Sequence, residues 1–167
     1  MLAETPASTE FAAVAFHEST HAFTLADCAT RPALANPMAR ILLVDDEPSI
    51  RALFGEVLAL EQHEVTTAGD GNAALAALAH GTFDLVVTDI VMPDKEGIEF
   101  IRETLQLRPD LPIIAMSGGG RGSSADYLTL ASLLGARMTL AKPFSARELL
   151  DAVARVMQGP GAVRPMA

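Results

Sequence analysis

The chain has 167 residues, of which 50% are hydrophobic and 20% charged, and its formal net charge is −9. This composition supports a folded core, and the acidic balance disfavours direct nucleic acid binding because phosphate backbones would be repelled. The single cysteine, Cys28, excludes an intramolecular disulfide framework and a cysteine-only zinc site. No apolar run is long enough for a membrane span, and the N-terminus lacks the features of a secretory signal, so we expect a cytoplasmic protein.

Residues 1–38 differ from the rest of the chain. They contain several Pro, Ser and Thr residues and alanine-rich apolar patches without steady periodicity, with a short helix predicted around Phe11–Leu25. Met38 leads directly into the first clear strand, so this extension is a linker, a tail or the result of a wrongly assigned start. We predict an extension at 1–38, one domain at 39–158 and a flexible tail at 159–167.

From Arg40 onward, short apolar runs alternate with helical segments. The apolar runs predict strands at Ile41–Val44, His63–Thr67, Leu85–Thr88, Pro112–Met116 and Arg137–Leu140. Helices are predicted from Pro48 onward and at Gly71–His80, Ile98–Leu107, Ser124–Leu134 and Ser145–Met157, the last capped by Ser145 with Glu148. The first helix has its apolar residues on one face, at Ile50, Leu53, Phe54, Val57 and Leu58. Strands that are each followed by a helix predict an α/β fold with a doubly wound parallel sheet.

Polar residues follow four of the predicted strands, where ligands bind in sheets of this kind. They are Asp45, Asp46, Asp89, Ser117 and Lys142. Two carboxylates about 4 Å apart repel each other by about 4 kcal/mol at an effective dielectric constant near 20, and a bound divalent cation removes that cost. Ligands that are all oxygen atoms favour Mg²⁺. With a lysine and a hydroxyl nearby, the group could hold a phosphoryl group on one carboxylate.

Four segments carry a resemblance to a known family. Val44–Pro48 (VDDEP), Thr88–Asp94 (TDIVMPD), Met116–Ser117 and Lys142–Phe144 (KPF) resemble, in order and spacing, the receiver domains of two-component response regulators. The resemblance covers residues 39–158. It implies a flavodoxin-like five-stranded parallel sheet of order 2-1-3-4-5 with five helices.

The same resemblance implies the roles of the acidic residues. Asp89 would be the phosphoacceptor, phosphorylated by a histidine kinase or a histidine phosphotransfer protein. Asp46 and Asp89 would bind Mg²⁺ through their side chains, Val91 through its backbone carbonyl, and Asp45 partly through water. The protein would be a phosphoacceptor rather than an enzyme, with Mg²⁺-dependent self-phosphorylation from small phosphodonors and slow autodephosphorylation.

The resemblance further implies that Ser117 and Lys142 contact the phosphoryl oxygens and that the Lys142–Pro143 bond is cis. Two features depart from the family. Thr139 stands where the family has Tyr or Phe, the ring that moves with the hydroxyl on phosphorylation. The loop Ser117–Ser124 contains four glycines and is longer than is common. We therefore expect the loop, rather than an aromatic side chain, to carry the conformational response.

Only a short polar tail follows Met157, which favours a stand-alone receiver. It would signal through protein–protein contacts with a downstream target, or act as a phosphate shuttle or sink. The alternative is a receiver-like interaction module that works without phosphorylation. A third interpretation is a zinc metalloprotease, because His17, Glu18 and His21 match H-E-x-x-H. A segment this short, without an evident third ligand, disfavours that interpretation.

Overall fold

The computed structural model describes residues 38–92, 97–118 and 124–159. Within these ranges the strands are β1 (Arg40–Val44), β2 (Glu64–Ala68), β3 (Leu85–Asp89), β4 (Ile113–Ser117) and β5 (Met138–Ala141). The helices are α1 (Pro48–Leu60), α2 (Gly71–His80), α3 (Gly97–Leu107), α4 (Ser124–Leu134) and α5 (Ala146–Met157). The predicted extension, its helix and H-E-x-x-H motif, most of the glycine loop and nearly all of the tail lie outside the described residues.

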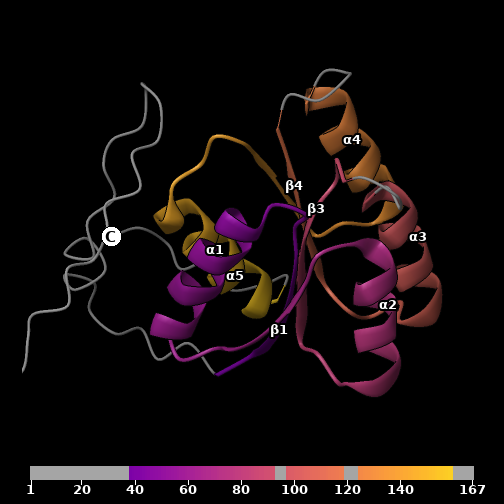
Figure 1. Cartoon of the computed structure of the whole chain (residues 1–167). Helices are drawn as coiled ribbons and strands as arrows, with labels where there is room; N and C mark the ends of the chain where they lie inside the picture. Colours follow the sequence, from indigo (N-terminus) through magenta and orange to yellow (C-terminus); the bar gives the residue numbers. More distant parts are fainter. Residues whose placement is uncertain (1–37, 93–96, 119–123, 160–167) are drawn as a thin grey trace, which may run out of the picture.

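All strands pair in parallel, in the order β2-β1-β3-β4-β5. Helices α1 and α5 cover one face of the sheet, and α2, α3 and α4 cover the other (Figure 1). Because side chains alternate along a strand, Ile41 and Leu43 pack under α1 and α5, whereas Leu42 and Val44 pack under the other layer. This arrangement confirms the predicted doubly wound α/β fold.

The strands are displaced slightly from the apolar pattern of the sequence. β2, β4 and β5 each begin and end one residue later than predicted, and β3 extends through Asp89. The reason is the pairing with neighbours: Asp89 is in register with Met116, and Ser117 with Ala141. Hydropathy does not detect a polar residue that belongs to the hydrogen-bonded ladder. Two of the predicted site residues therefore sit inside the sheet, not in the loops after it.

The helix ends follow the local sequence. α1 begins with Pro48 at its first position, and Ser145 forms the predicted capping box with Glu148 at the start of α5. α3 begins one residue earlier than predicted, at Gly97. Of the residues on the predicted apolar face of α1, Phe54, Val57 and Leu58 are buried, whereas Leu53 is 46% exposed. No helix in the described ranges has the length and apolar character needed to cross a membrane.

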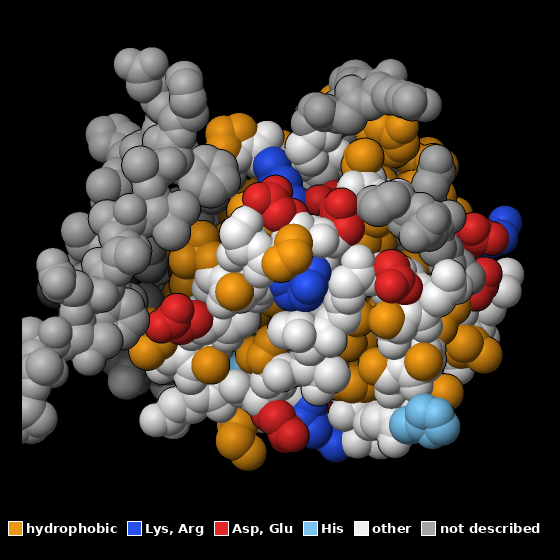
Figure 2. Space-filling model, viewed as in Figure 1, with side chains coloured by type: hydrophobic (Ala, Val, Ile, Leu, Met, Phe, Trp, Pro, Cys, Tyr) orange, Lys and Arg blue, Asp and Glu red, His pale blue; other side chains and the backbone are white. Residues whose placement is uncertain are grey.

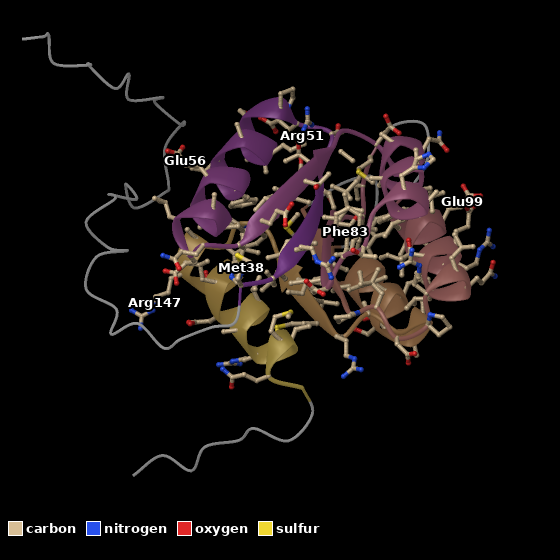
Figure 3. All side chains as sticks on the ribbon, turned by 90° about the horizontal axis from the view of Figure 1, so that it is seen from below. Met38, Arg51, Glu56, Phe83, Glu99 and Arg147 are labelled. Atoms are coloured by element: carbon tan, nitrogen blue, oxygen red, sulfur yellow. The ribbon has the colours of Figure 1, made fainter. Side chains whose placement is uncertain are left out.

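A buried histidine joins the start of the sheet to the turn after α1. His63 is 6% exposed, and its Nδ1 accepts a hydrogen bond of 3.3 Å from the backbone N–H of Ala39. Burial lowers the pKa of His63, and the nearby Glu61 acts in the opposite direction. Met38, which is exposed, lies at this end of the molecule between α1 and α5 (Figure 3).

Candidate functional site

The three predicted acidic residues meet at the carboxyl ends of β1 and β3. These two strands are neighbours in the sheet, so Asp45 directly after β1 lies beside Asp89 at the end of β3. Ligand oxygens of Asp45, Asp46 and Asp89 all lie within 4.8 Å of one another. Asp45 and Asp89 are buried, and Asp46 is the most exposed of the three. Acidic side chains lie beside a basic one near the top of Figure 2, on the side where the strands end.

Lys142 comes to this cluster from the end of β5. Its backbone N–H donates a 2.7 Å hydrogen bond to the carbonyl of Ser117. The Lys142 Nζ lies 2.9 Å from Asp45 Oδ2 and also contacts Asp89 Oδ2. Two residues further on, the ring of Phe144 stacks on Phe54 of α1, with centroids 5.2 Å apart. The lysine therefore bridges two buried carboxylates from an anchored strand end.

The charges in the cluster shift one another's ionisation. Burial raises the pKa of Asp45, and the hydrogen bond and charge of Lys142 partly offset that effect. For Lys142, burial alone would lower the pKa, but hydrogen bonds from its ammonium to Asp89 and Asp45 outweigh burial and raise it. With all carboxylates ionised, three acids and one ammonium leave two negative charges. A divalent cation would neutralise that charge.

Backbone amides orient two of the carboxylates. Asp89 Oδ1 accepts a 3.0 Å hydrogen bond from the N–H of Val91, and Asp45 Oδ1 accepts one of 3.0 Å from the N–H of Glu47. The Asp46 carboxylate makes no hydrogen bond or ion pair with any residue in the part of the chain that the structure describes. A ligand set made only of oxygen atoms fits Mg²⁺, which keeps several of its waters.

Ser117 is the last residue of β4, and Thr139 lies within β5. Ser117 is fully buried, and its hydroxyl donates a 3.2 Å hydrogen bond to the carbonyl of Gly118. Thr139 is half-buried and in register with Ala115 of β4. The Lys142–Pro143 bond is cis, as expected. The loop 119–123, expected to carry the response, lies outside the described residues.

Two residues near the site were missed from the sequence. Arg51 of α1 donates a 2.6 Å hydrogen bond from Nη1 to the backbone carbonyl of Asp45. Gly97 donates a 2.8 Å hydrogen bond to the carbonyl of Ile90, and a Cβ at Gly97 would meet the Asp89 carbonyl at 2.2 Å. A cation at the amino end of α1, where the helix dipole disfavours it, was the available signal for Arg51. The sequence held no comparable signal for the close approach at Gly97.

This fold and this group of side chains define a parallel α/β domain with an acidic site at the carboxyl edge of its sheet. The sequence matches the family described as "Response regulator receiver domain" over residues 41–154. The chain therefore belongs to the response regulator receiver family, as its motifs predicted. Receiver domains of this family act in two-component systems and bind Mg²⁺ at an acidic site.

Several curated relatives are regulators longer than this chain. The DNA-binding transcriptional regulator NtrC of Azospirillum brasilense is 39% identical over 119 residues, which cover 71% of this chain and 24% of that protein. The transcriptional regulatory protein CpxR of Klebsiella pneumoniae is 38% identical over 121 residues, covering 72% of this chain and 50% of that protein. The chain thus spans between a quarter and a half of the length of these relatives.

Solved structures give the same picture of the fold. A CheY-like receiver domain protein from Methanospirillum hungatei JF-1 is 30% identical, with a TM-score of 0.67, over 72% of this chain and 94% of that one. The receiver domain of NtrX from Brucella abortus is 34% identical, with a TM-score of 0.67, over 72% of this chain and 99% of that one. At these identities the likeness extends to sequence as well as to backbone.

Proposed function

We propose that this chain is a phosphorylation-dependent receiver in which Asp89 accepts a phosphoryl group from a histidine kinase or a histidine phosphotransfer protein. The observation that carries the proposal is the bridge made by Lys142 between the buried carboxylates of Asp45 and Asp89. Like charges held together in a buried site lower the stability of the protein. Such an arrangement is typical of a functional site, here one that would bind a cation and a phosphoryl group.

The metal would be held by the side chains of Asp46 and Asp89 and by the backbone carbonyl of Val91, with Asp45 acting partly through water. Once bound, Mg²⁺ supplies positive charge to the phosphoryl oxygens and to the crowded carboxylates. The hydrogen bond from the Glu47 N–H holds Asp45 in place beside this set. Among the described residues no hydrogen bond or ion pair ties the Asp46 carboxylate to another group, which supports its assignment as a metal ligand.

In the transfer step a carboxylate oxygen of Asp89 attacks the phosphorus of the donor phosphohistidine. The O–P bond forms as the N–P bond breaks, and the donor's imidazole nitrogen keeps the electron pair and takes up a proton. The hydrogen bond from the Val91 N–H to Asp89 Oδ1 holds the carboxylate in a fixed orientation. The Lys142 ammonium, paired with Asp89 before the reaction, then pairs with a phosphoryl oxygen.

After transfer, the hydroxyl of Ser117 would leave the Gly118 carbonyl and donate to the phosphoryl group. With Thr139 in place of an aromatic residue, no ring follows this movement into the sheet. We expect the segment 118–124 and the start of α4 to change instead, and to alter protein–protein contacts with a downstream target. The free energies of the two states need to differ by only a few kcal/mol for phosphate to shift their populations.

Titration with Mg²⁺ and beryllofluoride, a phosphoryl mimic, tests the assignment by calorimetry or NMR. Wild-type chain should bind the mimic only with Mg²⁺ present, and Asp89→Asn should lose that binding. Asp110→Asn is the matched control, because Asp110 is an exposed acid in the turn before β4. Mimic binding that persists in Asp89→Asn would overturn the assignment of the phosphoacceptor.

The competing function is a receiver-like module that binds partners without phosphorylation. Incubation with acetyl phosphate, followed by detection of an acid- and base-labile phosphoryl group, separates the two. A phosphate that appears on the wild type and is absent from Asp89→Asn supports the receiver. A protein that stays unmodified and yet binds its partner supports the module. Transfer onward to a histidine-containing protein would identify a phosphate shuttle.

A further inference from the structure

Arg51 reaches from α1 to the backbone of the acidic site. Its Nη1 donates a 2.6 Å hydrogen bond to the backbone carbonyl of Asp45. The Arg51 backbone is fixed at the beginning of α1, where its N–H donates to the carbonyl of Glu47 at 3.0 Å. Helical side chains point back toward the helix amino end, which explains how the guanidinium arrives at Asp45.

The carbonyl that Arg51 holds belongs to the peptide between Asp45 and Asp46. A peptide unit is planar, so the direction of the Asp45 carbonyl fixes the position of the Asp46 Cα and the direction in which the Asp46 side chain leaves. On the other side of Asp45, its own N–H donates a 3.2 Å hydrogen bond to the carbonyl of Ala68 at the end of β2. The turn is therefore clamped at both peptide planes around Asp45.

The guanidinium occupies a space that the next loop leaves open for it. A Cβ at Gly69, directly after β2, would lie 3.5 Å from Arg51 Nη1 and 3.7 Å from its Cζ. Figure 3 shows Arg51 on the side of α1 that faces β2 and α2. A single methyl group at Gly69 would make ordinary contact with the guanidinium, whereas a branched side chain would push it away from Asp45.

A cation at the amino end of a helix is unfavourable with respect to the helix dipole. The first turn of α1 contains no acid, but the N-cap Glu47 and the preceding Asp45 and Asp46 place carboxylates at this end of the helix. Arg51 therefore lies beside negative charge, and the hydrogen bond that it makes there goes to one specific atom, the Asp45 carbonyl oxygen.

We propose that Arg51 is a positioning residue that orients the Asp45–Asp46 turn for Mg²⁺, and so sets the metal affinity of the site. This inference rests on the proposed phosphoacceptor function. Residues that orient metal ligands from behind change metal affinity by about 10- to 100-fold when they are replaced. We expect Arg51→Met to weaken Mg²⁺ binding about 10-fold, and raised Mg²⁺ to restore the rate of phosphorylation from acetyl phosphate.

The test uses the full chain and measures Mg²⁺ binding alone, by calorimetry or NMR, with no phosphodonor present. Arg51→Lys retains one donor and should recover part of the affinity. Gly69→Val should reproduce the loss without changing the arginine, and Gly69→Ala should bind Mg²⁺ as the wild type does. The two Gly69 variants keep the test decisive if Arg51→Met folds poorly.

The outcomes are distinguishable. If wild type binds Mg²⁺ and Arg51→Met and Gly69→Val bind it equally well, Arg51 has only a structural role and the inference is wrong. A phosphorylation defect that saturating Mg²⁺ does not relieve also overturns it. If the wild type binds neither Mg²⁺ nor beryllofluoride, the proposed function itself fails, and the inference fails with it.

Discussion

Replacing Gly97 with alanine should damage both the stability of this domain and the proposed phosphorylation site. Gly97 begins α3 and is buried against the backbone that follows β3. A Cβ at this position would lie 2.2 Å from the Asp89 carbonyl oxygen, 2.6 Å from the Ile90 Cα and 2.9 Å from the Ile90 carbonyl oxygen. Backbone atoms cannot turn aside as a flexible side chain can, so α3 must move away from β3 by about 1 Å or more to reach ordinary contact distance.

The expected change in the free energy of unfolding depends on the contacts that this movement of α3 disturbs. The 2.8 Å hydrogen bond from the Gly97 N–H to the Ile90 carbonyl would be lost or lengthened, which costs about 1 kcal/mol. Crowding in a packed region destabilises the folded state by roughly a further 1–3 kcal/mol. Alanine also reduces the conformational entropy of the unfolded chain, which offsets up to about 1 kcal/mol of this loss. We expect the free energy of unfolding to fall by about 2 kcal/mol.

Urea denaturation of the full chain measures this change, with Gly55→Ala as the matched control. Gly55 lies within α1, and the nearest atom to its Cβ would be Thr67 Cγ2 at 3.8 Å, an ordinary contact. Gly55→Ala should therefore stabilise the protein by up to about 1 kcal/mol. Because Gly97 abuts Asp89, its variant should also be phosphorylated more slowly by acetyl phosphate. A Gly97→Ala protein as stable and as reactive as wild type would refute the steric argument.

Three further predictions concern other parts of the molecule. Thr104→Val should stabilise the protein by about 1 kcal/mol in urea denaturation, because the buried Thr104 hydroxyl has no hydrogen-bond partner among the described residues. Burial lowers the pKa of His63 from 6.5, so as the pH falls the imidazole is protonated in the unfolded chain before it is protonated in the folded one. The contribution of His63 to the free energy of unfolding is therefore fully present above pH 6.5 and is lost progressively below it. His63→Gln should show a weaker fall in unfolding free energy over that range. A chain beginning at Met38 should fold and be phosphorylated by acetyl phosphate at the wild-type rate, because every proposed site residue follows it.

Each of these has a clear opposing result. A destabilised Thr104→Val protein would mean that the hydroxyl is satisfied in solution. An identical pH profile for wild type and His63→Gln would show that His63 is not held neutral. A large loss of stability or reactivity on removal of residues 1–37 would show that the extension packs against the domain.

Local sequence determined the elements and the chemical identity of the site. Alternating apolar runs and caps predicted the strands and helices within a residue or so, because buried parallel strands need continuous apolar side chains and helix ends need partners for free N–H groups. The order of acids, hydroxyl and lysine along the chain predicted which residues converge, since the carboxyl ends of parallel strands share one edge of the sheet. Ser145 and Glu148 formed their capping box as expected, since all its atoms lie within four residues.

Only the tertiary structure decided the contacts between segments that are far apart in the sequence. The bridge of Lys142 to Asp45 joins residues 97 positions apart, and its geometry depends on how β5 and β1 are placed in the sheet. The exposure of Leu53 depends on which part of α1 the neighbouring α5 covers, and helical periodicity alone does not contain that information. Arg51 hydrogen-bonds to the Asp45 carbonyl, and Gly97 lies against the Asp89 carbonyl. Every residue has the same backbone atoms, so the sequence does not say which carbonyl either residue will contact, and these contacts exist only once the chain is folded.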